Sequence, residues 1–363
     1  MPWQPERVEA WLRLWAQDAL ASWAEAGRWP LHAGDREDFG DPAPAELSSL
    51  YCGGLGVWLA LAKLAAVGFC ELPESPAAIS RQLLKNYQAA PDTGECVPSW
   101  FLGQSSLLTA ACLAEPDAGL ADQLEALMRA NRENPTREAL WGAPGTLLGA
   151  LSLWEQTGES RWRATFLDSV EAIWSAWQQD PDSGLWLWEQ DMYGQQTRYL
   201  GAGHGWAGNL YPLWRGYALL DPDRQAALRM RSLDGLRSLA LESKLGVNWP
   251  PLPGSDRMLL QWCHGAPGMI TSLRFASLPE ALPLLQRAGQ LIVAAGPLRK
   301  GVSLCHGTAG NGAALLTLWQ LSGESEWLSQ ARHFGMFALD QAHKAYQTQG
   351  HWRYSLWTGD AGL

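Results

Sequence analysis

The sequence predicts an all-α protein in which an inner ring of helices is enclosed by an outer ring, an α/α toroid. Two observations carry this prediction: a repeated glycine motif, and the amphipathic segments that alternate with it. A turn of the form Gly-x-x-Gly, or a close relative, precedes an apolar stretch seven times, with first glycines at 53, 103, 142, 205, 265, 307 and 359. Repetition of this kind indicates that one structural unit recurs along the chain.

The segments between the glycine motifs carry apolar residues at the i, i+3, i+4 and i+7 spacing of an amphipathic helix. They cover residues 7–26, 75–88, 121–133, 161–179, 224–243, 281–295 and 326–345. About seven outer and seven glycine-led inner helices bury both sets of apolar residues as two concentric rings. We expect each glycine motif at one rim of the barrel, where helix N-termini present unpaired N–H groups.

Seven units around one axis predict a single domain over residues 1–363. Segments with Gly, Trp and turn signals at 91–100, 181–190, 245–254 and 348–357 are expected to form loops or small hairpins over the mouth of the barrel. The seventh copy stops at Leu363, directly after its glycine motif. Either the closing inner helix is missing from this sequence, or the ring closes in another way.

The composition argues against several classes of partner. Its 27 basic and 37 acidic residues give a net charge of −10 without runs of like charge, which disfavours nucleic acid. The N-terminus lacks the pattern of a signal peptide, and no span of about 18 uncharged apolar residues occurs. We therefore expect a soluble, cytoplasmic protein without membrane insertion. Its six cysteines are expected to be free thiols or metal ligands.

Aligning the seven motifs on their first glycine brings histidines and cysteines into two neighbouring columns. His204, His264 and His306 stand immediately before that glycine, and Cys263 and Cys305 stand one position earlier. Equivalent positions of a closed ring face the same opening, so Cys263, Cys305 and His306 can converge. Two thiolates and one imidazole with an open fourth position form a known catalytic zinc arrangement. The alternative is that these are small buried residues that tighten helix starts.

The other two histidines of the column have different expected roles. His264 is either a fourth metal ligand or, as we favour, a residue that points into the neighbouring helix with its ring N–H on a carbonyl. His204 follows Gly203 instead of a cysteine, which makes it a poor ligand on the same rim. It is expected to act as a proton donor or acceptor beside the metal, unless it is a hydrogen-bonded core histidine.

The blocks WCHGAPG at 262–268 and LCHGTAGN at 304–311, preceded by GHGWAGN at 203–209, resemble the lanthionine synthetase C-like (LanC-like) proteins. The resemblance covers the whole chain through all seven glycine motifs. It implies that Cys263, Cys305 and His306 hold zinc inside a double ring of helices, and that His204 takes part in acid/base chemistry. In this family, bacterial cyclases add a peptide cysteine to dehydroalanine or dehydrobutyrine to form lanthionine. Eukaryotic relatives bind glutathione and add it to dehydroamino acids in proteins.

Two positions depart from the dedicated cyclases of that family. They carry an Asp four residues before the third motif and an Arg four residues before the first zinc cysteine, where this chain has Glu138 and Leu259. Arg257 is the nearest guanidinium in the sequence. The chain therefore resembles the stand-alone and eukaryotic-type members more closely. Glu138 is expected either to orient a proton donor or the substrate amide, or to cap a helix.

Residues and resemblance together predict a zinc-dependent enzyme. It would add the thiol of a peptide cysteine or of glutathione to a dehydroamino-acid peptide or protein, giving a thioether. One alternative is a module that retains zinc and binds thiol compounds or partner proteins without turnover. A second alternative is a glycoside hydrolase on a helical toroid, which needs two carboxylates beside a sugar. Its candidate carboxylates are Glu138, Asp180, Asp182, Glu189, Asp191 and Asp360.

Overall fold

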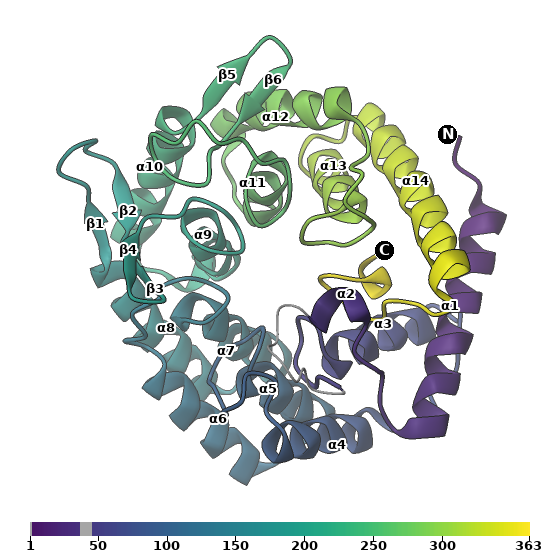
Figure 1. Ribbon diagram of the computed structural model, residues 1–363. Helices are drawn as coiled ribbons and strands as arrows, with labels where there is room; N and C mark the ends of the chain where they lie inside the picture. The colour runs from purple at the N-terminus through teal and green to yellow at the C-terminus, as the bar shows by residue number, and fades with distance from the viewer. Residues whose placement is uncertain (1, 37–45) are drawn as a thin grey trace.

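The computed structural model describes residues 2–36 and 46–363 and consists of two concentric rings of helices (Figure 1). The outer ring is formed by α1 (Pro5–Ala26), α4 (Pro76–Ala89), α6 (Ala118–Ala130), α8 (Ser160–Ser175), α10 (Pro222–Ser238), α12 (Leu282–Ala295) and α14 (Ser325–Gln349). The inner ring is formed by α3 (Gly54–Ala66), α5 (Gln104–Ala114), α7 (Ala143–Thr157), α9 (Trp206–Arg215), α11 (Ala266–Ser272) and α13 (Thr308–Ser322). The predicted α/α toroid is confirmed.

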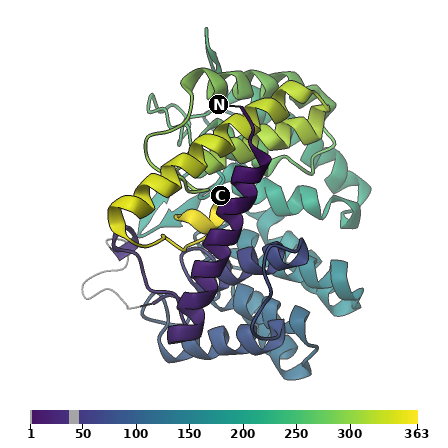
Figure 2. The same cartoon turned by 90° about the vertical axis from the view of Figure 1, so that its right-hand side faces the viewer.

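The seventh glycine motif leads into a single 3-10 turn, η4 (Asp360–Gly362), instead of an α-helix. This turn contacts α3 and lies between α3 and α13 (Figure 1). The described inner ring thus contains six α-helices and one short turn, where the sequence predicted about seven helices. The ends of the outer ring, α1 and α14, lie side by side (Figure 2). A single domain over 1–363 stays a prediction.

The two glycines of each motif have different tasks at the rim. The first is the N-cap of an inner helix, and at Gly205 and Gly265 its φ is 125° and 113°, which favours glycine. The second glycine lies against a carbonyl of the preceding turn. A Cβ would lie 1.9 Å from the Trp262 oxygen at Gly268 and 2.0 Å from the Leu304 oxygen at Gly310. At these positions the turn therefore folds under the start of the helix in space that a side chain would occupy.

Three two-stranded antiparallel hairpins connect outer and inner helices. They pair β1 (Trp177–Gln179) with β2 (Trp186–Trp188), β3 (Gln190–Met192) with β4 (Gln195–Thr197), and β5 (Leu241–Ser243) with β6 (Gly246–Asn248). The hairpins agree with the expectation for 181–190 and 245–254. Residues 91–100 form turns without a strand, and 350–357 form an irregular loop.

One helix, α2 (Ala33–Arg36), has no counterpart in the predicted repeat. All six cysteines lie in the described residues, and none forms a disulfide. Within residues 2–36 and 46–363, no helix combines the length and apolar character needed to cross a membrane. The largest fully buried side chains include many tryptophans, so packing between helices is a main use of this residue; they are Trp15, Trp162, Trp177, Trp188, Trp206, Trp214, Trp249 and Trp352.

The contact between the second glycine and a carbonyl predicts that two Gly→Ala substitutions change the free energy of unfolding in opposite directions. A Cβ at Gly56 would lie 2.4 Å from the Leu50 carbonyl oxygen, so we expect Gly56→Ala to lower the free energy of unfolding by about 1–3 kcal/mol. Gly335 lies in α14 with its nearest neighbour 4.0 Å away, so Gly335→Ala should raise the free energy of unfolding by about 0.5–1 kcal/mol. Urea unfolding measures both, and equal stabilities would contradict the role of the contact.

Candidate metal centre

Backbone hydrogen bonds join neighbouring glycine motifs at the rim. They connect residues of one sequence column, the position two residues before the first glycine. Five such bonds of 2.9–3.4 Å link, in order around the ring, Gly203, Cys263, Cys305, Trp357, Tyr51 and Phe101. We call this series the rim belt. Cys263 and Cys305 are consecutive members of the belt. Their side chains therefore lie in the same part of the opening.

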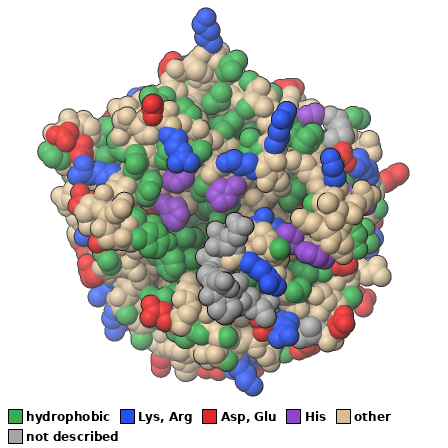
Figure 3. Space-filling view, viewed as in Figure 1, with side chains coloured by type: hydrophobic (Ala, Val, Ile, Leu, Met, Phe, Trp, Pro, Cys, Tyr) green, Lys and Arg blue, Asp and Glu red, His purple; other side chains and the backbone are tan. Residues whose placement is uncertain are grey.

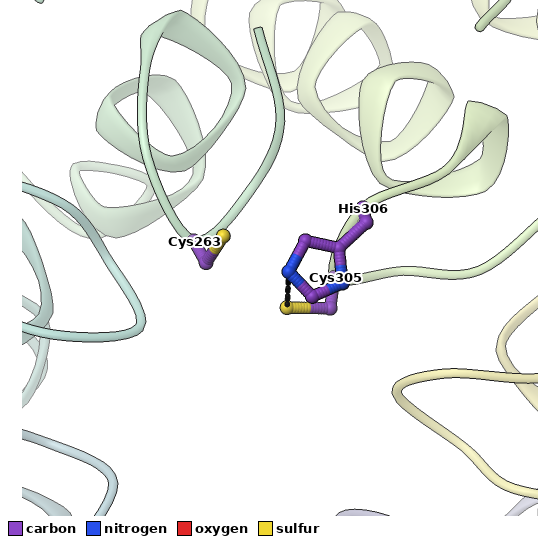
Figure 4. A group of neighbouring side chains, drawn as sticks. All are labelled: Cys263, Cys305 and His306. Carbon is purple, nitrogen blue, oxygen red and sulfur yellow. Dashed lines mark hydrogen bonds between the residues drawn. The ribbon is translucent and has the colours of Figure 1, made fainter. Parts of the chain in front are cut away.

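Cys263, Cys305 and His306 come together where α11 and α13 begin, and their side chains point toward one another (Figure 4). Their two sulfurs and one imidazole nitrogen all lie within 4.8 Å of one another. The cysteines are 6 % and 1 % exposed, whereas His306 is partly exposed. This donor set of two sulfurs and one imidazole fits zinc, and three protein ligands leave a position for another molecule.

The two thiols of the cluster titrate as a pair. A hydrogen bond from Cys305, helped by His306, lowers the pKa of Cys263 to about 4 against the effect of burial. Burial, together with the negative charge of Cys263, raises the pKa of Cys305. The pair thus favours the thiolate form at Cys263, and a cation bound by both sulfurs would favour that form at Cys305 as well.

His204 and Glu138 form a hydrogen-bonded pair near the cluster. His204 Nδ1 lies 3.0 Å from Glu138 Oε2, and the Glu138 side chain is fully buried. A carboxylate only accepts, so Nδ1 carries a proton and Nε2 is the nitrogen that exchanges one. Burial lowers the pKa of His204, but the hydrogen bond to Glu138 and its charge outweigh burial and raise that pKa above its ordinary value.

A cavity of about 310 Å³ is lined both by Cys263, Cys305 and His306, which we call the metal cluster, and by His204. Its wall also includes His264, Arg257 and Leu259. Histidine side chains gather at the centre of this face of the molecule (Figure 3). The volume lies at the lower end of the range of small-molecule sites.

Comparisons with known proteins agree with this architecture. The model of the lanthionine synthetase C-like protein family matches residues 45–363. The chain belongs to this family. The solved structure of nisin cyclase has the same fold, with a TM-score of 0.62, 16 % sequence identity, and coverage of 96 % of this chain and 91 % of that chain.

Two curated relatives of this LanC-like chain are eukaryotic-type members, as the departures at Glu138 and Leu259 indicated. Glutathione S-transferase LANCL1 of Danio rerio is 27 % identical over 239 residues, which are 62 % of this chain and 56 % of the relative. LanC-like protein GCL1 of Arabidopsis thaliana is 31 % identical over 178 residues, which are 46 % of this chain and 39 % of the relative. The matched regions span about half the length of these relatives, or less.

Glu138 also binds the turn that precedes α7. Its carboxylate accepts the backbone N–H groups of Leu140 and Trp141 at 2.9 and 2.6 Å. The N-cap of α7 is Gly142, so Glu138 bonds to the turn and not to the first turn of the helix. Glu138 therefore contacts His204, as the orienting interpretation expects, but it does not cap α7.

His264 lies outside the three-residue cluster. Its ring centroid is 5.4 Å from that of Tyr199 and 6.2 Å from that of His204. Its Nδ1 is buried without a hydrogen-bond partner among the described residues, so this nitrogen does not make the expected ring N–H bond to a carbonyl. Burial lowers the pKa of His264, which favours a neutral ring in the cavity wall of this LanC-like protein.

Three residues near the metal cluster were missed by the sequence reasoning. Tyr51 and Gln261 contact the two cysteine sulfurs, and Lys300 contacts Gln261. A signal was available for Tyr51, because it occupies the same column as Cys263 and Cys305. For Gln261 and Lys300 no repeated position gave such a signal.

The carboxylates that a glycoside hydrolase would need are engaged elsewhere. Asp180 pairs with Arg198 at 2.7 Å, and Asp191 accepts the backbone N–H of Gly194 at 2.9 Å. Glu189 also pairs with Arg198, and Asp360 accepts the backbone N–H of Arg353. Within the described parts of the chain, no carboxylate lines the 310 Å³ cavity. The cavity therefore lacks the acid pair that glycoside hydrolysis requires.

The Glu138–His204 pair predicts a change of pKa on substitution. Glu138→Gln removes the negative charge that raises the pKa of His204 and leaves burial, which lowers it. We expect the pKa of His204 to fall below that of the wild type, as measured by NMR titration of labelled histidine in the metal-free protein. Glu189→Gln, on an exposed side chain that pairs with Arg198, is the matched control. An unchanged pKa in Glu138→Gln would contradict the assigned interaction.

Proposed function

We propose that this LanC-like protein binds zinc through Cys263, Cys305 and His306 and joins a thiol to a dehydroamino acid as a thioether. The thiol belongs to a peptide cysteine or to glutathione, and the acceptor is dehydroalanine or dehydrobutyrine in a peptide or protein. The convergence of the three metal donors on a cavity that also contains His204 carries the proposal. Family membership supports it, and one relative bears the name glutathione S-transferase.

Zinc held by two thiolates and an imidazole would lower the pKa of an incoming thiol and supply it as a nucleophilic thiolate. The reaction is an addition, so its atoms balance without an oxidant or a leaving group. A bond forms between sulfur and the β-carbon, the carbon–carbon π bond breaks, and the α-carbon gains one proton. The thiol supplies the equivalent of that proton.

In this proposal His204 delivers this proton, since it lines the same cavity as the three metal donors. Glu138 fixes Nδ1, so the ring has one defined orientation and exchanges protons at Nε2. The raised pKa of His204 keeps a larger fraction of the ring protonated near neutral pH, as a general acid requires. Glu138 acts through His204 and is a positioning residue in this proposal.

A metal analysis combined with a thiol-addition assay tests the proposal. The purified protein should contain one zinc ion per chain and convert glutathione and a dehydroalanine peptide into a product with their summed mass. Cys305→Ala should lose both zinc and turnover, whereas Cys96→Ala, at an exposed position, should lose neither. Turnover that survives Cys305→Ala would exclude the thiol mechanism. Zinc and glutathione binding without product would instead identify a binding module.

His204→Ala separates metal binding from proton transfer. The variant should retain zinc, because His204 is not part of the three-residue cluster. Its turnover should fall by about 10²–10⁴-fold, the usual contribution of a general acid or base. An unchanged rate would remove His204 from the mechanism, and loss of zinc would assign it to the metal site.

A further inference from the structure

Each cysteine sulfur of the metal cluster accepts a hydrogen bond from a side chain outside the cluster. The Tyr51 hydroxyl donates to Cys305 Sγ at 2.9 Å, and Gln261 Nε2 donates to Cys263 Sγ at 2.9 Å. The cysteines are almost wholly buried, so these two donors provide polar contacts that water would otherwise supply.

The Tyr51 ring is fixed by its neighbours in the rim belt. It stacks on Trp357 with an interplanar angle of 10° and meets Phe101 edge-on at a centroid distance of 6.2 Å. Its backbone bonds to the same two residues at 3.0 and 2.9 Å. The hydroxyl therefore reaches Cys305 from a ring that is held by its main chain and by both ring contacts.

Lys300 determines which end of the Gln261 amide faces the sulfur. Lys300 Nζ lies 2.9 Å from Gln261 Oε1. An ammonium group has donors and no acceptor, so it must face the carbonyl oxygen of the amide. The NH₂ end is then directed at Cys263 Sγ, and the amide orientation follows from chemistry. Gln261 is only 6 % exposed, so it has few alternative partners in water.

Two thiolates buried side by side lose their hydration, and hydrogen-bond donors besides a cation offset part of that cost. A hydrogen bond to a metal-bound sulfur takes up part of its charge and reduces its electron donation to the metal. We propose that Tyr51 and Gln261 are positioning residues of the metal centre, each of which orients one cysteine sulfur and limits its donation. The inference rests on the metal site of the proposed function.

The hydrogen bonds to the two cysteine sulfurs would also affect the sulfur of the substrate thiol. Cys263 and Cys305 would compete with an incoming thiolate for the same positive charge. Weaker donation from both cysteines leaves more of that charge to lower the pKa of the substrate thiol. Lys300 contributes through Gln261, because its charge polarises the amide whose N–H group contacts Cys263.

Cobalt substitution tests the inference without relying on turnover. Tyr51→Phe keeps the ring and removes the O–H donor, and Gln261→Leu removes the N–H donor at similar size. Each should move the thiolate-to-cobalt charge-transfer band to longer wavelength, because a sulfur without its hydrogen bond gives up an electron more easily. Each should also weaken zinc binding by about 10-fold in competition with a chelator. Tyr211→Phe, whose ring packs on Phe275 outside the cavity, should change neither property.

A double-mutant cycle tests the relay from Lys300. Lys300→Met should shift the cobalt band in the same direction as Gln261→Leu but by less. In the Gln261→Leu background, Lys300→Met should add no further shift, because its effect passes through the amide. An equal shift in both backgrounds would overturn the relay.

The outcomes distinguish this inference from the proposed function. A wild-type protein that binds cobalt with a thiolate band, but whose band is unmoved in both Tyr51→Phe and Gln261→Leu, overturns the inference and leaves the metal site intact. No metal uptake by the wild type overturns the proposed function and this inference with it. Circular dichroism checks folding, and Gln261→Met replaces Gln261→Leu if the latter does not fold.

Discussion

The contact between the second glycine and a backbone carbonyl, present in six of the seven motifs, is the constraint on which the other features of the rim depend. At Gly268 and Gly310 a Cβ would lie 1.9 and 2.0 Å from that oxygen. Because the glycines leave this space, each turn folds under the start of its helix and brings the residue two before the first glycine next to the following copy. The rim belt and the meeting of Cys263 with Cys305 follow from that approach.

The rim belt is regular on the side of the metal cluster and changes at the third copy. In five copies the column residue donates its N–H to the carbonyl of a neighbouring copy, but Leu140 donates to Glu138 Oε2 instead. The Leu140 carbonyl accepts from the Ser99 hydroxyl at 2.5 Å, so a side chain replaces the backbone link to the second copy. The second copy is also the one in which Ser106 replaces the later glycine. At this interruption Glu138 accepts the Leu140 N–H, and the same carboxylate contacts His204.

The ring and the metal cluster could be predicted from the sequence because both follow from repetition. Their fixed offset from the first glycine puts Cys263, Cys305 and His306 at equivalent rim positions, and this backbone placement does not depend on side-chain rotamers. The surroundings of His264 and the bonds of Gln261 and Lys300 depend on rotamers and on loop paths, which no period determines. At Gly359 the period left two outcomes open, a missing helix or another closure of the ring, and the structure has a 3-10 turn there.

In the proposed addition, the cysteine side of the rim and the His204 side act on two different proton-transfer steps. The sulfur side would take a proton from the thiol, and His204 would place one on the α-carbon. The two steps need opposite charges near the reacting groups. A thiolate is stabilised by nearby positive charge, whereas nearby negative charge raises the pKa of an imidazole that acts as an acid. Glu138 raises the pKa of His204 from a fully buried position that does not line the cavity. Its charge therefore acts mainly on the imidazole, while the substrate thiolate meets the imidazole instead of the carboxylate.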